Sequence, residues 1–288
     1  MCLAGSRRRG GVFIAINTPI MENRPILQSL FYNAPGKDEY PPKSSSWTNA
    51  LYDILSCVEA NTDDNNVIVI HKNSKYVCSY DKFPKAKHHL LLMCRNYPAN
   101  PSCLRNVTSL NDLTKDHLEE LREFHQFGRS IAAAICGEDK STSFKLGYHA
   151  IPSLHPLHLH IISSDLDSPC VTTRKHITSF ASMFFVTADE VENHLESAFV
   201  ESISLDVRKE RAQDVLSNTP LECQYCARAA SNVPDWKRHN QICPMIETPS
   251  KKRRATKHEE VFNSLLGWKS TKVLTNSSGR SKKRSRED

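Results

Sequence analysis

Three histidines stand close together in the segment 147–169, which reads GYHAIPSLHPLHLHIISSDLDSP. His158 and His160 are two residues apart, and residues at this spacing in a strand point to the same face. The apolar residues at 157, 159 and 161 then point into the core on the other face. His149 can reach the same place from a neighbouring strand. Imidazoles that converge in this way need a partner, which is either a phosphate or a metal ion.

A phosphate partner suits these residue types well. A neutral imidazole can attack phosphorus in line, while flanking imidazoles donate hydrogen bonds to the non-bridging oxygens. The intermediate is a phosphoramidate, which water hydrolyses in a second step. The alternative is that these histidines are ordinary surface or core residues. That alternative is weaker for an alternating pair beside a third histidine than for any single one.

A second group of residues, near the C-terminus, has the spacing of metal ligands. Cys223 and Cys226 form a Cys-x2-Cys knuckle, and His239 and Cys243 follow at a spacing of four residues. On one helix face such a pair can complete a tetrahedral Zn²⁺ site with the knuckle. We therefore expect a zinc finger at residues 221–244, with one structural zinc per chain and no metal in catalysis. Because the metal supplies much of the folding energy of so small a unit, the finger should unfold without it.

The finger is locally basic, because it contains Arg228, Lys237 and Arg238. These cations favour contact with DNA phosphates, and a finger that binds a protein is the alternative. One finger alone would specify few bases. The expected target is therefore a DNA end or nick that is recognised by its shape and chemistry.

The hydrophobic pattern indicates the elements that must position these residues. Apolar residues at helical spacing predict helices at 47–59, 114–136 and 188–199. Short apolar runs predict strands at 66–71, 75–80, 88–94, 143–150 and 157–163, and the turn at 73–74 joins the first two as a hairpin. Strands that are followed by a helix and then by more strands favour an α+β fold with a mainly antiparallel sheet and flanking helices.

Charge is distributed unevenly along the 288 residues. The net charge is +6, and the residues from Pro244 onward hold 12 Lys and Arg against 5 Asp and Glu. The rest of the chain is therefore close to neutral. The basic runs at 251–254 (KKRR) and 280–288 (RSKKRSRED) are typical of nuclear import signals or DNA anchors, with plain solubilising charge as the alternative. No stretch approaches the roughly 20 apolar residues of a membrane span.

Five regions follow from these patterns. We expect a variable, disordered extension at 1–44, a catalytic domain at 45–200, a linking helix or segment at 201–220, the finger at 221–244 and a disordered basic tail at 245–288. Localisation in the nucleus is the corresponding expectation.

The histidine segment resembles the signature of the histidine-triad (HIT) family, His-φ-His-φ-His-φ-φ, in which φ is apolar. LHLHII matches its end, so that His158 falls on the middle position, the nucleophile of the family, and His160 falls on the third. Pro156 stands at the first position, and His155 lies one residue away with the wrong strand parity to replace it. The resemblance implies the HIT fold and leaves the role of the first histidine in doubt.

Further motifs are similar to one branch of this family, the aprataxins, which hydrolyse adenylated DNA. These are YDKFPKAKHHLLLM, KLGYHAIPSLHPLHLHIISSDLDSPC and the downstream RKH. The resemblance runs from about Trp47 to the end of the finger. Animal aprataxins also carry a forkhead-associated domain, for which 45 N-terminal residues are too few. The expectation is thus a short, fungal-like form.

The resemblance implies roles for the pocket residues. His158 would form a covalent adenylate, and His149 and His160 would steady the phosphate and the leaving group. Asp81 would bind the ribose hydroxyls, since a carboxylate can accept two hydrogen bonds. Leu51 would line the adenine slot.

Other residues would contact DNA or the edge of the pocket. Lys85 and Lys87 would contact DNA or active-site phosphates, and His89 would lie at the pocket edge. Trp47 would stack on the exposed terminal base pair, a contact worth about 1–3 kcal/mol per base.

Ordinary alternatives exist for several of these residues. The two lysines could belong to a solvated turn, Trp47 could be a core aromatic, and Asp81 could stabilise a turn. Lys175 and His176 could contact phosphate or could be surface charge.

The first functional hypothesis is a DNA-repair hydrolase that releases AMP from DNA 5′ ends left adenylated by abortive ligation. It could also remove GMP from DNA 3′ ends. The second is a general HIT hydrolase of small nucleotides, against which the finger and the lysines argue. The third is a non-catalytic DNA-binding scaffold, which the loss of histidine at 156 would allow and the intact His158 opposes.

Overall fold

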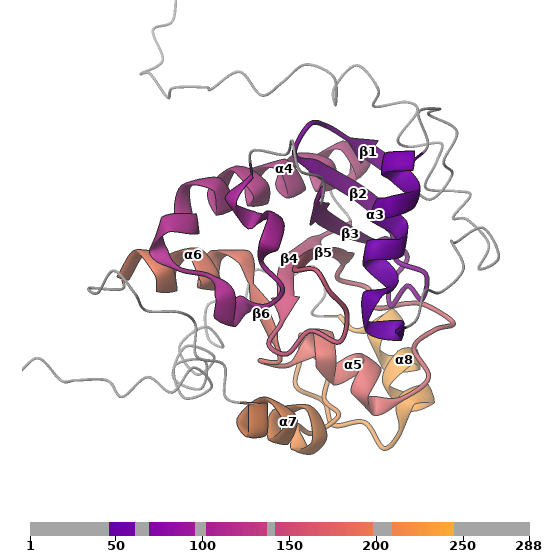
Figure 1. The fold of residues 1–288 in the computed structure, drawn as a ribbon. Helices are drawn as coiled ribbons and strands as arrows, with labels where there is room; N and C mark the ends of the chain where they lie inside the picture. Colours follow the sequence, from indigo (N-terminus) through magenta and orange to yellow (C-terminus); the bar gives the residue numbers. More distant parts are fainter. Residues whose placement is uncertain (1–45, 61–68, 96–101, 137–141, 198–208, 245–288) are drawn as a thin grey trace, which may run out of the picture.

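The computed structural model describes residues 46–60, 69–95, 102–136, 142–197 and 209–244 (Figure 1). The predicted extension at 1–44 and the basic tail at 245–288 lie outside these residues. Among the helices that are described, none is long and apolar enough to cross a membrane.

A six-stranded antiparallel sheet forms the centre of the protein. Its strands are β1 (Val69–Lys72), β2 (Tyr76–Tyr80), β3 (His89–Cys94), β4 (Phe144–His149), β5 (His158–Ser163) and β6 (Phe185–Thr187). They lie in the order β1-β2-β3-β5-β4-β6, and every neighbouring pair is antiparallel. The five predicted strands are present, and the α+β HIT-like fold class is confirmed. The sequence does not reveal β6, because three residues are too few to show an alternating pattern.

Helices cover both faces of this sheet (Figure 1). They are α3 (Ala50–Ala60), α4 (Leu118–Cys136), α5 (Arg174–Ala181), α6 (Ala188–Ser197), α7 (Lys209–Asn218) and α8 (Val233–Ile242). Short 3-10 turns occupy Trp47–Asn49, Cys103–Asn106, Leu110–Asp112 and Lys115–His117. The first two predicted helices therefore begin a few residues later than expected, since a 3-10 turn precedes each of them. Helix α5 is too short for its periodicity to stand out in the sequence.

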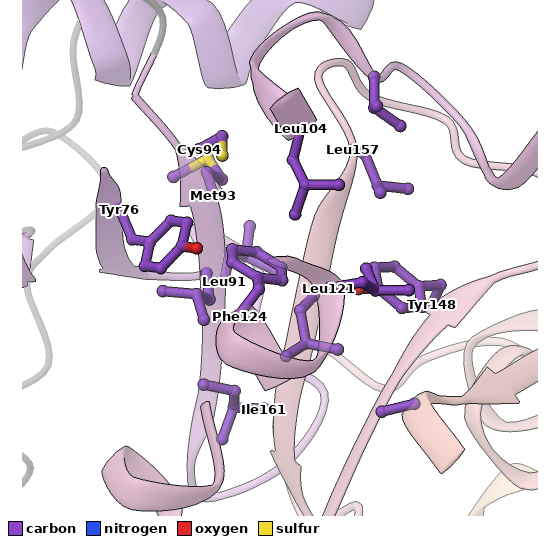
Figure 2. Close-up of a cluster of buried hydrophobic side chains, with 14 of the residues drawn as sticks. Tyr76, Leu91, Met93, Cys94, Leu104, Leu121, Phe124, Tyr148, Leu157 and Ile161 are labelled. Atoms are coloured by element: carbon purple, nitrogen blue, oxygen red, sulfur yellow. The ribbon is translucent and has the colours of Figure 1, made fainter. Parts of the chain in front are cut away.

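The residues of β5 alternate between two different environments. Leu159 and Ile161 face α4, where Gly128 allows the helix to approach: a Cβ at this glycine would lie 2.9 Å from Leu159 Cδ2. Figure 2 shows part of the apolar core, to which Phe124 of α4 contributes. Its ring lies 5.0 Å from that of Tyr76. Strand parity thus places the apolar residues of β5 in the core, as predicted.

The opposite face of the sheet carries the histidines and a second apolar cluster. His158 and His160 of β5 share a pocket with residues of α3 and α5. Further along β5, Ile162 packs with Phe180 of α5 and Trp236 of α8. Trp236 is only 1% exposed. The finger therefore packs directly against the sheet face that carries the histidines.

Strand β4 passes unusually close to β6 at Gly147. A Cβ at this position would lie 2.3 Å from the Val186 carbonyl oxygen and 2.9 Å from Thr187 Cα. We expect Gly147→Ala to lower the free energy of unfolding by about 1–3 kcal/mol, because a clash with backbone cannot be relieved by a rotamer change. Urea unfolding followed by circular dichroism measures this change.

Gly128→Ala is the matched control, since the nearest atoms are side-chain methyls that can move. Alanine in that helix also gains about 1 kcal/mol of helix propensity. Equal stability of Gly147→Ala and wild type would contradict the close approach of the two strands.

Candidate active site

A pocket of about 380 Å³ opens on the histidine face of the sheet. This volume lies in the range of small-molecule sites in proteins. Its walls are built by α3 with the 3-10 turn before it, the turn after β2, the ends of β3, β4 and β5, the loop before β5, and helix α5. The lining residues from these segments include Trp47, Leu51, Ile54, Asp81, Lys82, Phe83, Lys85, His89, His149, Leu154, His158, His160, His176 and Phe180.

Strand pairing brings the histidines of the pocket together. Gly147 of β4 pairs with His160, so His149 lies one strand away on the same face. The ring of His160 lies 4.5 Å from that of His149 and 4.8 Å from that of His158. The predicted convergence of three imidazoles is therefore present.

The backbone fixes the tautomer of His158. Its Nδ1 lies 2.9 Å from the carbonyl oxygen of Pro156. A carbonyl can only accept, so Nδ1 carries the proton and Nε2 keeps its lone pair. Pro156, which stands where the family has its first histidine, thus contributes a backbone acceptor to the site. His155 lies elsewhere, with its Nδ1 3.3 Å from the carbonyl oxygen of Thr108.

A relay of hydrogen bonds fixes the tautomer of His160. The backbone N–H of Lys85 donates to Nδ1 of His89 over 3.1 Å, which leaves the proton of that ring on Nε2. His89 Nε2 lies 2.9 Å from Nδ1 of His160 and donates to it. His160 must then carry its own proton on Nε2. The relay turns this nitrogen into a donor.

This donor is buried and unsatisfied within the described part of the protein. His160 Nε2 has no hydrogen-bond partner there, and neither has Nε2 of His149. Unpaired buried polar groups are uncommon in native structures and occur at functional sites. A bound group with acceptor oxygens, such as a phosphate, would satisfy them.

A metal ion is the alternative partner for the residues of this pocket. The ligand atoms of Asp81, His89 and His160 lie within 4.8 Å of one another, which is close enough for a shared ion. However, both nitrogens of His89 are engaged, one as acceptor from Lys85 and one as donor to His160. No lone pair of this ring is free for a metal, so the arrangement favours an anion.

Burial keeps these imidazoles neutral at physiological pH. It lowers the pKa of His89 to about 4 and that of His149 to about 3. Burial also holds the pKa of His160 well below the ordinary value, and it lowers that of His158 against the opposing effect of the Pro156 carbonyl. A neutral His158 is the form that can act as a nucleophile.

The contact between His89 and Asp81 is therefore not an ion pair. The Nδ1 atom lies 3.7 Å from Asp81 Oδ2, but the ring is neutral. Asp81 Oδ1 accepts the backbone N–H of Phe83 over 2.6 Å. The aspartate thus stabilises the turn after β2, as the simpler interpretation expects, and it also lines the pocket.

The start of α3 forms the apolar end of the pocket. Leu51 and Ile54 are buried in this wall, and Leu154 of the loop before β5 also lines the pocket. Trp47 is 58% exposed at the rim, so its interpretation as a core aromatic is wrong. Its exposed ring is available to a molecule that enters the pocket.

The other predicted contact residues divide into two groups. Lys85 and His176 line the pocket, whereas Lys87 and Lys175 do not. Lys85 Nζ donates to the carbonyl of Phe83. His176 Nδ1 accepts the backbone N–H of Thr172 over 3.2 Å, which leaves a proton on Nε2.

His89 differs most from its predicted position. It is 3% exposed and forms part of the inner wall, so the expectation that it lies at the pocket edge is wrong. The prediction overlooks that its strand parity places it beside His160, since β3 and β5 pair with His89 opposite Ile162.

Sequence reasoning misses several lining residues, among them Ile54, Lys82, Phe83, Leu154 and Phe180. Phe180 contacts the rings of His89, His149 and His160 at centroid distances of 5.2, 4.7 and 5.3 Å. Its spacing of three from the apolar residue at 177 is a helical signal, but it is a weak one in so short a helix.

The four predicted metal ligands lie together in the finger. The Sγ atoms of Cys223 and Cys243 are 3.7 Å apart, and Cys226 Sγ lies 3.1 Å from His239 Nε2. Zinc–sulfur bonds of about 2.3 Å in a tetrahedron place two sulfurs about 3.8 Å apart. The donor set and its spacing are compatible with zinc.

The basic residues of the finger make contacts within the protein. Arg228 pairs with Asp235 at 3.1 Å and Arg238 pairs with the same carboxylate at 3.5 Å. Lys237 Nζ donates to the carbonyl of Ser168 over 2.8 Å. Lys237 therefore joins the finger to the loop after β5, and its contact with DNA remains a prediction.

The lowered pKa values of the histidines make the stability of the fold depend on pH. An unfolded histidine titrates near 6.5, whereas folded His89 and His149 titrate at about 4 and 3. At pH values between the folded and the unfolded pKa, these histidines bind a proton in the unfolded chain but not in the folded one. We expect the free energy of unfolding to fall from pH 7 to pH 5, with a slope of up to about 1.4 kcal/mol per pH unit for each such histidine.

Urea unfolding at a series of pH values measures this slope. His89→Gln should show a shallower slope than wild type, because one of the buried groups no longer titrates. Stability that is constant between pH 7 and pH 5 would contradict the burial of neutral imidazoles.

Known proteins resemble this chain over the region that carries the pocket. The family described as "Scavenger mRNA decapping enzyme C-term binding" matches residues 53–176. Aprataxin from Gallus gallus is 34% identical over 172 residues, which cover 60% of this chain and 49% of the relative. The aprataxin-like protein of Saccharomyces cerevisiae is 26% identical over 211 residues, which cover 65% and 90%.

A solved structure is also similar. The aprataxin ortholog Hnt3 from Schizosaccharomyces pombe matches with a TM-score of 0.45 and 23% identity, over 68% of this chain and 92% of that one. The chain spans about half the length of the animal aprataxins that it matches, namely 47%, 49% and 48%.

The relatives named aprataxin or aprataxin-like come from animals and from two yeasts. The chain is therefore similar to the aprataxins and aprataxin-like proteins, and its fold is HIT-like.

Proposed function

We propose that this protein is a DNA-repair hydrolase that removes AMP from adenylated DNA 5′ ends through a covalent adenylate on His158. The observation that carries this proposal is the combination of tautomers in the pocket. His158 keeps a lone pair on Nε2, while the neighbouring His160 offers a buried N–H on Nε2. A nucleophile beside a fixed donor is the arrangement that phosphoryl transfer needs.

The reaction then proceeds in two displacements. His158 Nε2 forms a bond to the phosphorus of the adenylate, and the bond from that phosphorus to the bridging oxygen of the DNA phosphate breaks with its electron pair. The DNA leaves with a free 5′-phosphate. Water then attacks the phosphorus, the P–N bond breaks, and AMP is released with a neutral imidazole restored. His160 Nε2–H donates to the phosphate oxygens in both steps, with His149 beside it.

The nucleoside fits the opposite end of the pocket. Leu51, Ile54 and Leu154 offer apolar surface to the base. Asp81 keeps Oδ2 for the ribose hydroxyls, because Oδ1 is occupied by the Phe83 N–H. Lys85 and His176 lie at the phosphate side, where cationic and N–H donors would bind the DNA phosphate.

The DNA would meet the rim and the finger. Trp47 is exposed at the pocket mouth, where its ring can stack on a terminal base pair. Lys87, Lys175, Arg228, Lys237 and Arg238 are the remaining candidates for phosphate contacts. Removal of GMP from DNA 3′ ends would use the same nucleophile. The basic runs of the tail support work in the nucleus.

A general hydrolase of small nucleotides is the second candidate. The pocket volume of about 380 Å³ suits a mononucleotide without any contribution from DNA. The exposed ring of Trp47 at the rim has no evident role in that function. A non-catalytic scaffold is opposed by the intact His158 with its fixed tautomer.

We expect His158→Ala to reduce the release of AMP from adenylated nicked DNA by roughly 10³-fold or more, because the covalent step is lost. Release of AMP and quenched mass analysis of the protein–nucleotide adduct measure the effect. His155→Ala, outside the pocket, should keep wild-type activity.

Small dinucleotides tested in parallel separate the rival functions. Faster turnover of these than of DNA would favour the second candidate. Turnover of neither substrate would favour the scaffold.

We further propose that Cys223, Cys226, His239 and Cys243 hold one structural Zn²⁺. Metal analysis should find about one zinc per chain, and Cys226→Ala should lose it. Removal of the metal should unfold α8, which circular dichroism and the fluorescence of Trp236 would report. A metal-free protein with unchanged fluorescence would contradict the assignment.

A further inference from the structure

Four side chains of the finger form hydrogen bonds with one segment of the catalytic domain, residues 164–168. Gln224 Nε2 and Tyr225 OH both donate to the carbonyl of Ser164, each over 2.9 Å. Asn240 Nδ2 donates to the carbonyl of Asp165 over 2.5 Å, and Lys237 Nζ to that of Ser168 over 2.8 Å. All four hydrogen bonds end on backbone carbonyls, those of Ser164, Asp165 and Ser168, so the contacts fix the path of the segment 164–168.

This segment in turn holds the turn that precedes β3. Ser168 Oγ donates to the carbonyl of Pro84 over 2.6 Å. Asp165 Oδ1 accepts the backbone N–H of Lys87 over 3.0 Å. Between these two anchors lies Ala86, which is 2% exposed and belongs to the same apolar cluster as Trp236 of the finger.

The residue enclosed by these anchors is Lys85, whose backbone N–H begins the tautomer relay. It donates to His89 Nδ1, and His89 Nε2 donates to His160. Hydrogen bonds, joined by short stretches of the chain at 165–168 and 84–87, therefore connect the finger to the imidazole beside the nucleophile.

We infer that the finger is a positioning element of the catalytic pocket: by holding the segment 164–168, it keeps the Lys85 N–H on His89 and so sets which nitrogen of His160 carries the proton. Asn240 and Ser168 are the positioning residues at the two ends of this path. The inference rests on the proposed function for its kinetic consequence only. The kinetic consequence is that the finger supports bond cleavage even in a substrate that contains no DNA.

Two variants interrupt the path at different places. Asn240→Ala removes the contact on the finger side, and Ser168→Ala removes the contact to Pro84 without altering the finger. Gln241→Ala is the matched control, because it deletes an exposed amide from the adjacent position of α8.

The direct measurement is the ¹⁵N NMR spectrum of the imidazoles in the full chain, in which protonated and unprotonated nitrogens differ strongly in chemical shift. We expect both path variants to lose the single tautomers of His89 and His160 that wild type and Gln241→Ala show. The parallel kinetic measurement uses an adenosine 5′-phosphoramidate, a substrate without DNA. We expect kcat to fall roughly tenfold or more in both path variants with little change in KM, since a misplaced catalytic group costs about this much.

Zinc content and far-UV circular dichroism confirm that each variant is folded. If Asn240→Ala fails to fold, Ser168→Ala carries the test, because it lies outside the finger. Unchanged tautomers and unchanged kcat in the folded variants, with only DNA affinity reduced, would overturn the inference and leave the proposed function intact. A wild-type protein that hydrolyses neither DNA nor phosphoramidate would instead refute the proposed function, and the tautomers would still decide the inference.

Discussion

The chemistry of this pocket depends on one hydrogen bond, from the backbone N–H of Lys85 to Nδ1 of His89. A neutral imidazole has one nitrogen that donates a hydrogen bond and one that accepts. A site that needs a donor at a given position must therefore disfavour the tautomer that places the acceptor there. A backbone N–H does this well, because it can only donate and cannot change its protonation state. The buried His89 passes the constraint to His160, and burial keeps both rings neutral so that the constraint holds at physiological pH.

The histidine opposite this relay obtains its tautomer in the complementary way. His158 donates from Nδ1 to a backbone carbonyl, which can only accept. The carbonyl belongs to Pro156, at the position where the family signature has its first histidine. Since the contribution comes from the main chain, the proline does not impair it. The tautomers of the nucleophile and its neighbouring donor are thus both set by backbone groups, directly for His158 and through His89 for His160. Burial outweighs the charge of Asp81, which by itself would raise the pKa of His158.

The sequence predicts the parts of the structure that are governed by local periodicity. The period of two in β5 separates Leu159 and Ile161 from His158 and His160, and the Cys and His spacing places the four ligands of the finger. It does not predict β6 or α5, whose patterns span too few residues, nor the inner position of His89, which depends on the pairing of β3 with a distant strand. The roles of Asp165 and Ser168 could not be predicted either. They act through contacts with backbone atoms of residues about eighty positions away, and a sequence carries no signal for such contacts.

The close packing of Trp236 against Ile162 and Phe180 has a mechanical consequence. With its helix fixed to the sheet in this way, the finger cannot swing toward or away from the pocket to suit what is bound. A double helix that touches both must adjust its own curvature, and the energy of that distortion depends on how readily the duplex bends. Under the proposed function, interrupted duplexes, which hinge at the break, would be accommodated at lower cost than continuous ones, so that a rigid protein would distinguish flexible DNA from stiff DNA.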